Sequence, residues 1–391
     1  MCGIVGYKKF SSNSQNFSLS LKIATDSLSL RGPDFQSTLV LGNLGFGHAR
    51  LSIIDTSDNA NQPMQDPSGR FTLIFNGEIY NYKQLKSQIH RVSWRSTSDT
   101  EVLLHLLIQK GTSCLEELNG FFAFAFYDSH TDRLVIARDR MGIKPLHYFQ
   151  NNDFLVFGSE MKALMQFPIP REIDHKSLNW YLKLTYLPRD HSMLSGVKKL
   201  LPGHYLEFDK NRSTVKSYES PDQEKTFHGS FESAKSNTLK LLQKSVERRM
   251  VADVPLGAFL SGGTDSSAVV AMASKFDSNL NTFSIGYRDH PFFDETQYAE
   301  LVAQKFKTNH TTFSLTNDDL LNSIEDSIGY LDEPFGDSSA IPTFILSKMV
   351  STSMKVALSG DGADELFGGY YKHLAFVKAH QATIGNSILK K

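Results

Sequence analysis

Residues 254–276 read VPLGAFLSGGTDSSAVVAMASKF, and this stretch sets the fold class of the second half of the chain. Its apolar run at 256–260 has the length of a buried strand, and a Gly-rich turn follows at 261–263. The small and apolar residues at 266–276 then predict a helix. A strand that passes through a glycine turn into a helix is typical of a β-α-β unit around a parallel sheet.

The same alternation extends on both sides of this stretch. Helix-like segments occur at 236–250 and 295–306, and short apolar runs occur at 282–285 and 355–358. Helices that alternate with short apolar strands favour a doubly wound parallel sheet. We therefore predict an α/β domain over residues 236–391.

The first 210 residues have a different pattern. Aromatic and β-branched residues form short runs bounded by Gly, Asp or Asn at 4–7, 37–41, 71–75, 121–127 and 134–137. Helical periodicity is confined to 19–28 and 101–109. This pattern predicts antiparallel sheets flanked by helices, an α+β domain over residues 1–210. Residues 211–235 are polar and predict a linker that contains a strand or a turn.

Composition narrows the class of protein. The chain has 391 residues and a formal net charge of -1, so no strong attraction to nucleic acid or to an anionic membrane is expected. It contains only two cysteines, Cys2 and Cys114, which are too few for a disulfide framework. The cysteine content therefore favours a protein of the reducing cytoplasm over a secreted one. No run approaches the ~20 apolar residues that span a bilayer, and the first thirty residues lack a signal-peptide pattern.

The turn at 261–266, SGGTDS, is the first candidate site. Small residues at a helix N-terminus leave backbone N–H groups free to bind phosphate. An ordinary strand-turn-helix connection does not need Ser, Gly, Gly, Asp and Ser together. No Gly-Lys-Ser/Thr follows, so the turn is not a Walker A loop.

Cys2 is the second candidate. Removal of Met1 would leave a thiol and a free α-amine on one residue, and an N-terminal amine can act as the base for its own side chain. The alternative is that Cys2 is a small apolar residue at the start of a strand. His48 is expected to be structural, because the amine already supplies a base, and Cys114 is expected to pack in the core.

Three further motifs favour a catalytic Cys2. Arg50 precedes a β-rich run at 51–55, and its guanidinium can bind a carboxylate bidentately. Asn76 and Gly77 end a strand and can form an oxyanion hole. Asp99 lies at the expected N-cap of a helix, where simple capping is the alternative to ligand binding.

Taken together, residues 1–210 resemble the class II glutamine amidotransferase domain, an N-terminal-nucleophile hydrolase with an αββα sandwich. The resemblance rests on MCGIVGY (1–7), RGPD (31–34), GHARLSIID (47–55), FNGEIYN (75–81), STSDTEV (96–102) and ARDRMGIKPLHYF (137–149). It implies that Cys2 attacks the glutamine amide and that Asn76 and Gly77 stabilise the oxyanion. The implied glutamine-binding residues are Arg50, Leu51, Ser52, Ile53, Ile54, Asn76, Gly77, Glu78 and Asp99.

The second half resembles the ATP pyrophosphatases through SGGTDS, FSIGY (283–287), DEPFGDSSAIPT (332–343) and LSGDGADELFGGYY (358–371). The implied ATP-binding residues are Leu260, Ser261, Gly262, Gly263, Asp265, Ser266, Ile285, Ser359 and Gly360. Asp361, Asp364 and Glu365 are implied at the acceptor site, and Asp265 and Asp364 at Mg²⁺ on the pyrophosphate. Both halves together resemble the glutamine-dependent asparagine synthetases, which use glutamine, aspartate and ATP. The resemblance leaves a homodimer open.

Two departures leave alternatives open. Asp361 stands where the family has a glutamate, and the family continues well beyond the GGY turn, so the second domain is expected to be incomplete at its C-terminus. One alternative is an amidotransferase acting on another carboxylate, for example in surface-glycan synthesis. Another is a protein with glutaminase activity only, or a non-catalytic partner of a longer homologue. We expect the 391-residue chain to make asparagine poorly and its second domain to be the less stable one.

Overall fold

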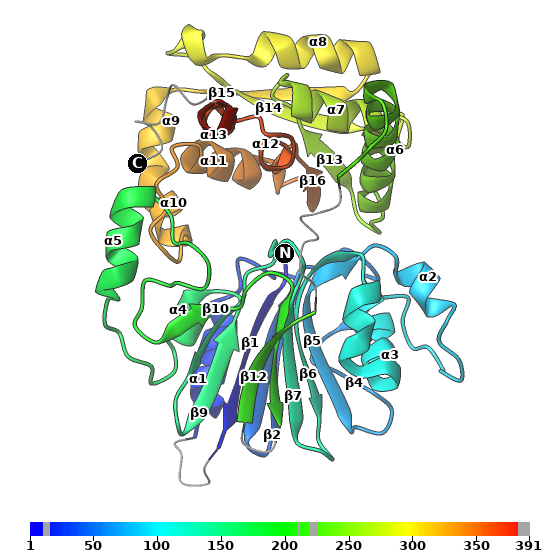
Figure 1. The fold of residues 1–391 in the computed structure, drawn as a ribbon, viewed down its shortest axis with the longest axis vertical. Coiled ribbons are helices and arrows are strands. Elements are labelled where there is room, and N and C mark those ends of the chain that lie inside the picture. Colours follow the sequence, from blue (N-terminus) through cyan, green and yellow to red (C-terminus); the bar gives the residue numbers. More distant parts are fainter. Residues whose placement is uncertain (11–15, 210–211, 219–225, 382–391) are drawn as a thin grey trace. The chain divides into compact units, whose positions relative to one another are not determined.

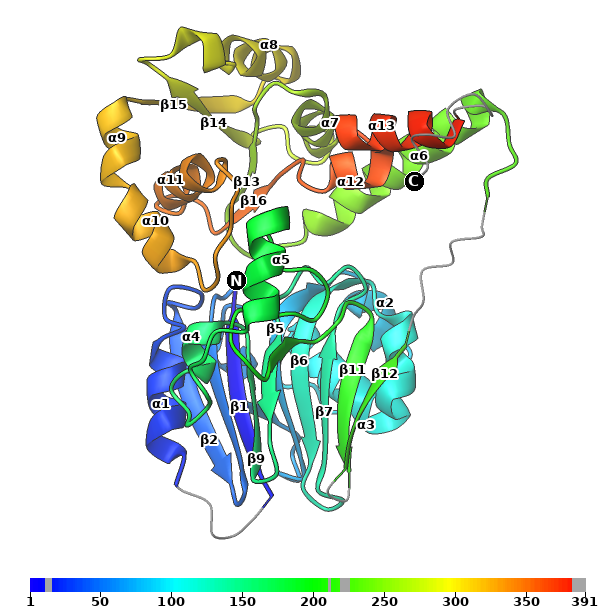
Figure 2. The ribbon, with the colours of Figure 1, turned by 60° about the vertical axis from the view of Figure 1, so that its left-hand side comes forward.

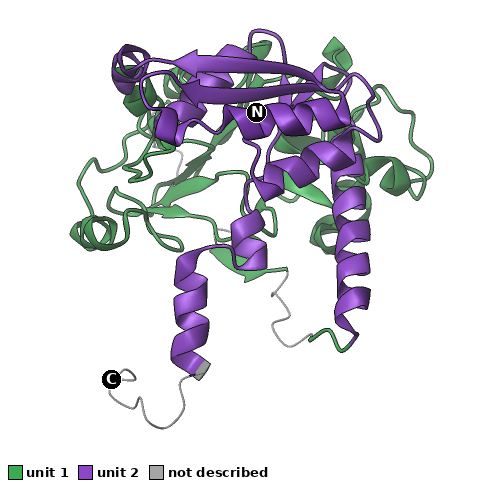
Figure 3. Cartoon of the chain, turned by 90° about the horizontal axis from the view of Figure 1, so that it is seen from above, with its two compact units in different colours: residues 1–228, 325–340 green, residues 229–324, 341–391 purple. Residues whose placement is uncertain are grey.

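The computed structural model describes residues 1–10, 16–209, 212–218 and 226–381, drawn in Figure 1. Its contacts divide the chain into two compact units. Unit 1 contains residues 1–228 and 325–340, and unit 2 contains residues 229–324 and 341–391 (Figure 3). Unit 1 is therefore discontinuous in sequence, because a short segment from the second half of the chain packs with it.

The described residues of unit 1 form two six-stranded antiparallel sheets. The first has the order β10-β8-β9-β1-β3-β2, with β1 (Gly3–Lys9), β2 (Phe35–Leu41), β3 (Leu44–Arg50), β8 (His147–Gln150), β9 (Phe154–Gly158) and β10 (Val197–Lys199). The second has the order β12-β11-β7-β6-β5-β4, with β4 (Met64–Gln65), β5 (Phe71–Ile79), β6 (Gly120–Asp128), β7 (Arg133–Arg138), β11 (His204–Asp209) and β12 (Arg212–Ser217).

β1 lies inside the first sheet and is buried on both faces. Alternate side chains of a strand point to opposite faces, so Ile4 packs with side chains of both sheets, whereas Val5 and Tyr7 pack toward α1 (Ser18–Asp26). Gly6 allows a close approach here, since a Cβ at this position would lie 2.4 Å from the Phe157 ring. The apolar run that follows Cys2 therefore anchors the start of the chain in the core.

Helices cover the two outer faces of this pair of sheets (Figure 2). α1 and α4 (Met161–Leu164) pack on the first sheet, and α3 (Asp99–Lys110) packs on β5 of the second, next to α2 (Tyr82–Lys86). The remaining helical elements of unit 1 are η1 (Asp58–Ala60), η2 (Gly111–Glu117), α5 (His175–Leu184) and, except for its first residue, α10 (Ile324–Tyr330). The four layers form an αββα sandwich, which confirms the fold class expected for the first half.

Unit 2 is built on a four-stranded parallel sheet with the order β15-β14-β13-β16. Its strands are β13 (Leu256–Phe259), β14 (Asn281–Tyr287), β15 (Asn309–Leu315) and β16 (Val356–Leu358). The chain adds β14 and β15 on one side of β13 and then returns to add β16 on the other side. The strand order therefore reverses between β13 and β16, which makes the ends of these two strands a topological switch point.

Helices lie on both faces of the parallel sheet. Side chains of α6 (Phe231–Arg249), α7 (Thr264–Ala273) and α8 (Thr296–Phe306) share one apolar cluster. A second apolar cluster contains Phe283 of β14 and side chains of α11 (Ala340–Val350). The other helical elements of unit 2 are η3 (Pro291–Phe293), α9 (Asn317–Asn322), α12 (Ala363–Phe367) and α13 (Tyr371–Gln381). This arrangement confirms the expected α/β class. α13 exposes apolar side chains, with Tyr371 91% and Phe376 64% exposed.

The structure differs from the expected boundaries in two places. Residue 210 lies between β11 and β12, which pair with each other, so the sheet of unit 1 continues past it. Residues 325–340 fall within the expected second domain but belong to unit 1. Residues 211 and 219–225 of the expected linker lie outside the described residues, as do residues 382–391. None of the helices described is long and apolar enough to cross a membrane.

Candidate active site

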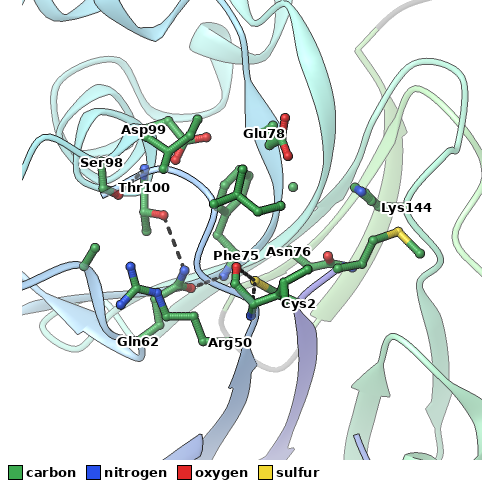
Figure 4. A pocket seen from close by; sticks show the side chains of 16 residues that line it. Cys2, Arg50, Gln62, Phe75, Asn76, Glu78, Ser98, Asp99, Thr100 and Lys144 are labelled. Atoms are coloured by element: carbon green, nitrogen blue, oxygen red, sulfur yellow. Dashed lines mark hydrogen bonds between the residues drawn. The ribbon is translucent and has the colours of Figure 1, made fainter. Parts of the chain in front are cut away.

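A pocket in unit 1 contains most of the residues that the sequence predicted for the glutamine site (Figure 4). It lies where β1 begins, where β3 and β5 end and where α3 starts. Its lining includes the predicted residues Cys2, Arg50, Leu51, Ile53, Ile54, Asn76, Gly77, Glu78 and Asp99. The predicted residue Ser52 does not line it, and its backbone N–H instead donates to Asp34 Oδ2 over 2.8 Å.

The start of the chain is held in place around Cys2. The Leu51 backbone N–H lies 3.4 Å from Cys2 Sγ, and Arg31 Nε donates to the Cys2 carbonyl oxygen over 2.9 Å. The terminal amine is carried by Met1 in this chain. Burial, with added repulsion from Lys144 and Arg31, lowers the pKa of this amine to about 5. An amine in these surroundings is neutral at pH 7 and can therefore accept a proton.

Asn76 contributes a polar group without a described partner. The residue is fully buried in β5, and among the described residues neither its side-chain nitrogen nor its oxygen has a hydrogen-bond partner. Leaving such a group unsatisfied costs about 1–3 kcal/mol. Because Asn76 lines the same pocket as Cys2, its amide is available to a ligand bound there.

Asp99 is a buried carboxyl group at the first turn of α3. The N-cap is Ser98, whose side chain accepts from the Thr100 N–H over 2.9 Å, so the expectation that Asp99 is the N-cap was wrong by one residue. Asp99 Oδ2 instead accepts from the Ile79 N–H over 2.9 Å. Burial, together with the nearby Glu78 carboxylate, raises the pKa of Asp99 to about 7.

Arg50 is the last residue of β3, and no strand follows it. The expected β-rich run at 51–55 is therefore wrong: these residues form a loop along the pocket. The last pair of the ladder between β2 and β3 is Phe35 with Arg50, and the Asp34 N–H donates to Arg50 O over 3.0 Å beyond it. Arg50 donates to Ser57 O (2.9 Å), Asn61 Oδ1 (2.7 Å) and Asp55 O, so these described bonds use three of its five donors.

Lys144 is a pocket residue that the sequence reasoning did not single out. It lines the pocket with Cys2 and Glu78, and burial lowers the pKa of its ammonium. The available signal was its place in the ARDRMGIKPLHYF motif. His48, by contrast, does not line the pocket. Its Nε2 lies 3.1 Å from Phe75 O, and burial lowers its pKa to about 3, so it is a neutral core residue. Cys114 is also buried.

In unit 2, the predicted phosphate loop connects β13 to α7 at the topological switch point. Ser261 Oγ lies 3.0 Å from Ser266 Oγ and 3.3 Å from the Gly263 N–H. Gly262 has φ +85°, and a Cβ there would lie 2.5 Å from Tyr298 Cβ, so only glycine fits without strain. Gly263 is the N-cap of α7, which leaves its first backbone N–H groups facing the loop.

The second predicted loop follows β16 and meets the first. A Cβ on Gly360 would lie 2.9 Å from the Ser266 backbone nitrogen, so the two loops approach closely. Ser359 Oγ donates to Asp361 Oδ2 over 3.0 Å, and Tyr370 donates to Glu365 over 2.8 Å. Ile285 lies near the end of the adjacent strand β14. Leu260 is buried behind the loop.

The carboxylates near these loops do not form a metal site from protein atoms alone. Among the described residues, no group of three or more His, Cys, Asp or Glu side chains could hold a metal ion. Mg²⁺ commonly binds through one or two carboxylates plus substrate phosphates. Asp265 lies in the first turn of α7, and Asp364 lies in the first turn of α12.

Known proteins extend what the fold and the pocket show. An αββα sandwich with a cysteine just before the strand that starts the chain is the arrangement of the N-terminal-nucleophile hydrolases, and unit 2 adds a doubly wound α/β fold. Residues 1–219 match the family model of the glutamine amidotransferase domain, and residues 237–386 match that of asparagine synthase.

Similar proteins place both halves in one family. A Methanocaldococcus jannaschii protein, provisionally named asparagine synthetase [glutamine-hydrolyzing] 2, is 34% identical over 96% of this chain and 76% of its own length. Asparagine synthetase [glutamine-hydrolyzing] 3 of Bacillus subtilis is 33% identical over 97% of this chain and 65% of its own length. The solved structure of glutamine phosphoribosylpyrophosphate amidotransferase from B. subtilis is 17% identical, with a TM-score of 0.41, over 80% of this chain and 65% of that one.

The chain therefore belongs to the glutamine-hydrolysing asparagine synthetase family, a family of ATP-dependent ligases that use glutamine. It spans 76% of the archaeal relative but less than two thirds of the Bacillus one.

Proposed function

We propose that this chain hydrolyses glutamine at Cys2 and transfers the ammonia to an aspartate activated by ATP. The observation that carries the first half of this proposal is the buried Asn76 amide, which has no partner among the described residues and lines the pocket of Cys2. A buried donor beside a thiol supports a reaction in which negative charge develops on a carbonyl oxygen.

The hydrolysis would proceed in two steps. After removal of Met1, the Cys2 sulfur attacks the side-chain amide carbon of glutamine while the freed α-amine of Cys2 accepts the thiol proton. The oxyanion is stabilised by the Asn76 amide and the Gly77 N–H. Collapse of this intermediate breaks the carbon-nitrogen bond, and the amine returns the proton to the leaving ammonia. Water then cleaves the thioester, which yields glutamate and restores the thiol.

The charged residues of the pocket would recognise the amino-acid end of glutamine. The two donors of Arg50 that its described bonds leave over can bind the α-carboxylate. Asp99 and Glu78 supply negative charge for the α-ammonium group, and both line the pocket. This arrangement favours a zwitterionic amino acid over a simple amide, because Arg50 offers positive charge to the carboxylate while Asp99 and Glu78 offer negative charge to the ammonium group.

The second reaction would use the loops at the ends of β13 and β16. The loop at 261–266 and the start of α7 would hold the phosphates, with Ser359 and Gly360 beside the nucleotide and Ile285 against the adenine. Attack of the aspartate β-carboxylate on the α-phosphate releases pyrophosphate and gives β-aspartyl-AMP, from which ammonia then displaces AMP. Mg²⁺, held by Asp265 and Asp364, would neutralise the pyrophosphate charge. Asp361 and Glu365 would face the acceptor.

Two experiments on one sample test this proposal. The first measures glutamate released from glutamine, and the second measures AMP, pyrophosphate and asparagine formed from aspartate and ATP with glutamine or ammonium salt. ADP and phosphate as products would refute the adenylation step. Glutamate without asparagine would limit the activity to glutamine hydrolysis. We also propose that the protein acts in the cytoplasm and that it forms a homodimer, which light scattering tests.

A further inference from the structure

Four charged side chains link Cys2 to the segment of unit 1 that comes from the second half of the sequence. Arg31 Nε donates to the Cys2 carbonyl oxygen over 2.9 Å, and Arg31 Nη1 contacts Glu160 over 2.8 Å. Lys162 Nζ lies 3.0 Å from Glu160 and 3.7 Å from Asp332. Positive and negative groups therefore alternate from the nucleophile residue to Asp332.

Residues 159–162, a bend followed by the first two residues of α4 and called here the turn at 159–162, have a backbone that is fixed from both sides. Next to β1, the Ile4 N–H donates to Ser159 Oγ over 3.0 Å, and the Ser159 N–H donates to Ile4 O over 2.8 Å. On the other side, the Asp332 carboxylate accepts from the Met161 N–H and, over 3.4 Å, from the Lys162 N–H. This turn therefore lies between the strand that begins after Cys2 and a carboxylate 330 positions later in the chain.

Glu333 binds the segment 325–340 to a second part of unit 1, near Met193 and Lys199. It accepts from the Met193 N–H over 2.8 Å and pairs with Lys199 over 2.6 Å. Burial by itself raises its pKa, but contacts with His147 and Lys199 outweigh this effect and hold the pKa of Glu333 at about 2. Glu333 therefore stays ionised at working pH, and the two adjacent carboxylates anchor the segment to separate elements.

We propose that Asp332 is a positioning residue for glutamine hydrolysis, which fixes the turn at 159–162 and thereby the backbone of Cys2. The inference rests on the proposed glutaminase function, but its structural half does not depend on it. Asp332 lies in the part of the chain that matches the asparagine synthase model, so the hydrolytic site draws a residue from the other half of the sequence. Small displacements of a nucleophile are costly, since ~1 Å can lower a rate ~100-fold.

The test compares Asp332→Asn with Asp337→Asn in the full chain. Asp337 is the matched control because it belongs to the same segment, while the described bonds of its side chain go only to Ser339, over 2.9 Å and 2.7 Å. We expect Asp332→Asn to lower kcat for glutamine roughly tenfold, with KM changed less than about twofold. Asp337→Asn should keep both constants.

Amide hydrogen exchange supplies a readout that does not need activity. In Asp332→Asn, residues 2–6 and 159–162 should exchange roughly tenfold faster than in Asp337→Asn. A double-mutant cycle of Asp332→Asn with Lys162→Met should be non-additive in kcat, because both changes break the same chain of contacts.

Equal kcat and equal exchange in the two variants would overturn the proposal, and so would a loss of kcat that only follows the unfolded fraction. A wild-type chain without glutaminase activity would contradict the proposed function instead, while the exchange result would still decide the structural role of Asp332.

Discussion

Replacing Asp99 by asparagine should stabilise unit 1 at neutral pH and weaken glutamine binding at the same time. The side chains are nearly isosteric, and the asparagine oxygen can still accept from the Ile79 N–H that now bonds to Asp99 over 2.9 Å. The substitution removes the carboxyl group, which can ionise although it is buried. The expected gain in stability and the expected loss of glutamine binding therefore both follow from the change of one side-chain group.

The size of the stability effect follows from the pKa. Burial raises the pKa of Asp99 from 3.8 to about 7, a change of about three units. Each unit corresponds to about 1.4 kcal/mol, so folding loses up to about 3–4 kcal/mol from this group. The sign is set by the raised value: stability is fully present below pH ~4 and is lost as pH rises through ~7. Asp99→Asn should lack this loss.

Tryptophan fluorescence can follow unit 1 alone, because both tryptophans of the chain, Trp94 and Trp180, lie in it. Urea midpoints would be measured at pH 4.5, 6 and 8 for the wild type and for Asp99→Asn. We expect the midpoints to be similar at pH 4.5 and the variant to be the more resistant at pH 8. A variant that is equally or less resistant at pH 8 would refute the reasoning from burial.

The kinetic effect should have the opposite sign. A charged hydrogen bond contributes about 1.5–3 kcal/mol, so Asp99→Asn should raise KM for glutamine roughly 10- to 100-fold and change kcat less. In the wild type, KM should fall as pH rises through ~7, because Asp99 then ionises, whereas KM of the variant should not follow this titration. A kcat effect with unchanged KM would show that Asp99 takes part in the chemistry.

Three further substitutions test the other proposed roles. Cys2→Ala should abolish glutamine hydrolysis and leave any ammonia-dependent reaction unchanged, and full hydrolysis in this variant or in a chain that retains Met1 would rule out the N-terminal nucleophile. Asn76→Ala should lower kcat roughly 100- to 1,000-fold, as expected when an oxyanion donor is lost, and the readout is a slower formation of the Cys2 thioester. An unchanged kcat would show that Asn76 is not part of the oxyanion hole. Asp265→Asn should weaken magnesium-dependent ATP binding measured by calorimetry, and equal affinity with and without magnesium in both proteins would contradict its role.

The sequence predicted the layers of both units because they depend on local patterns. The apolar run of β6 and the alternation of β13, turn and α7 are each contained in about twenty neighbouring residues. Most pocket residues were also predictable, since they lie in short motifs at the ends of strands. Local patterns do not predict contacts between residues that are far apart in the sequence, however. The packing of residues 325–340 on unit 1 depends on Asp332 and Glu333 finding partners more than a hundred positions away.

The errors at the pocket have similar physical causes. The run after Arg50 has strand-like residues, but the pairing with β2 stops at Arg50, which lies opposite Phe35, the first residue of β2. Ser98 and Asp99 are both good capping residues, and only the Ile79 N–H decides between them. Lys144 has no special spacing in the sequence, and its position in the pocket follows from how the chain turns after β7.

The discontinuity of unit 1 has a consequence for how this protein is made. During translation, residues 1–228 emerge from the ribosome well before residues 325–340, and domains generally begin to fold during synthesis. Until the late segment emerges, Lys199 and the Met193 N–H lack the carboxylate that binds them in the finished protein. Unit 1 can therefore reach its final form only after most of the parallel sheet of unit 2 has been translated. If Asp332 positions Cys2, a nascent chain does not hydrolyse glutamine at its full rate until three of the four strands of the parallel sheet, β13, β14 and β15, have also been translated.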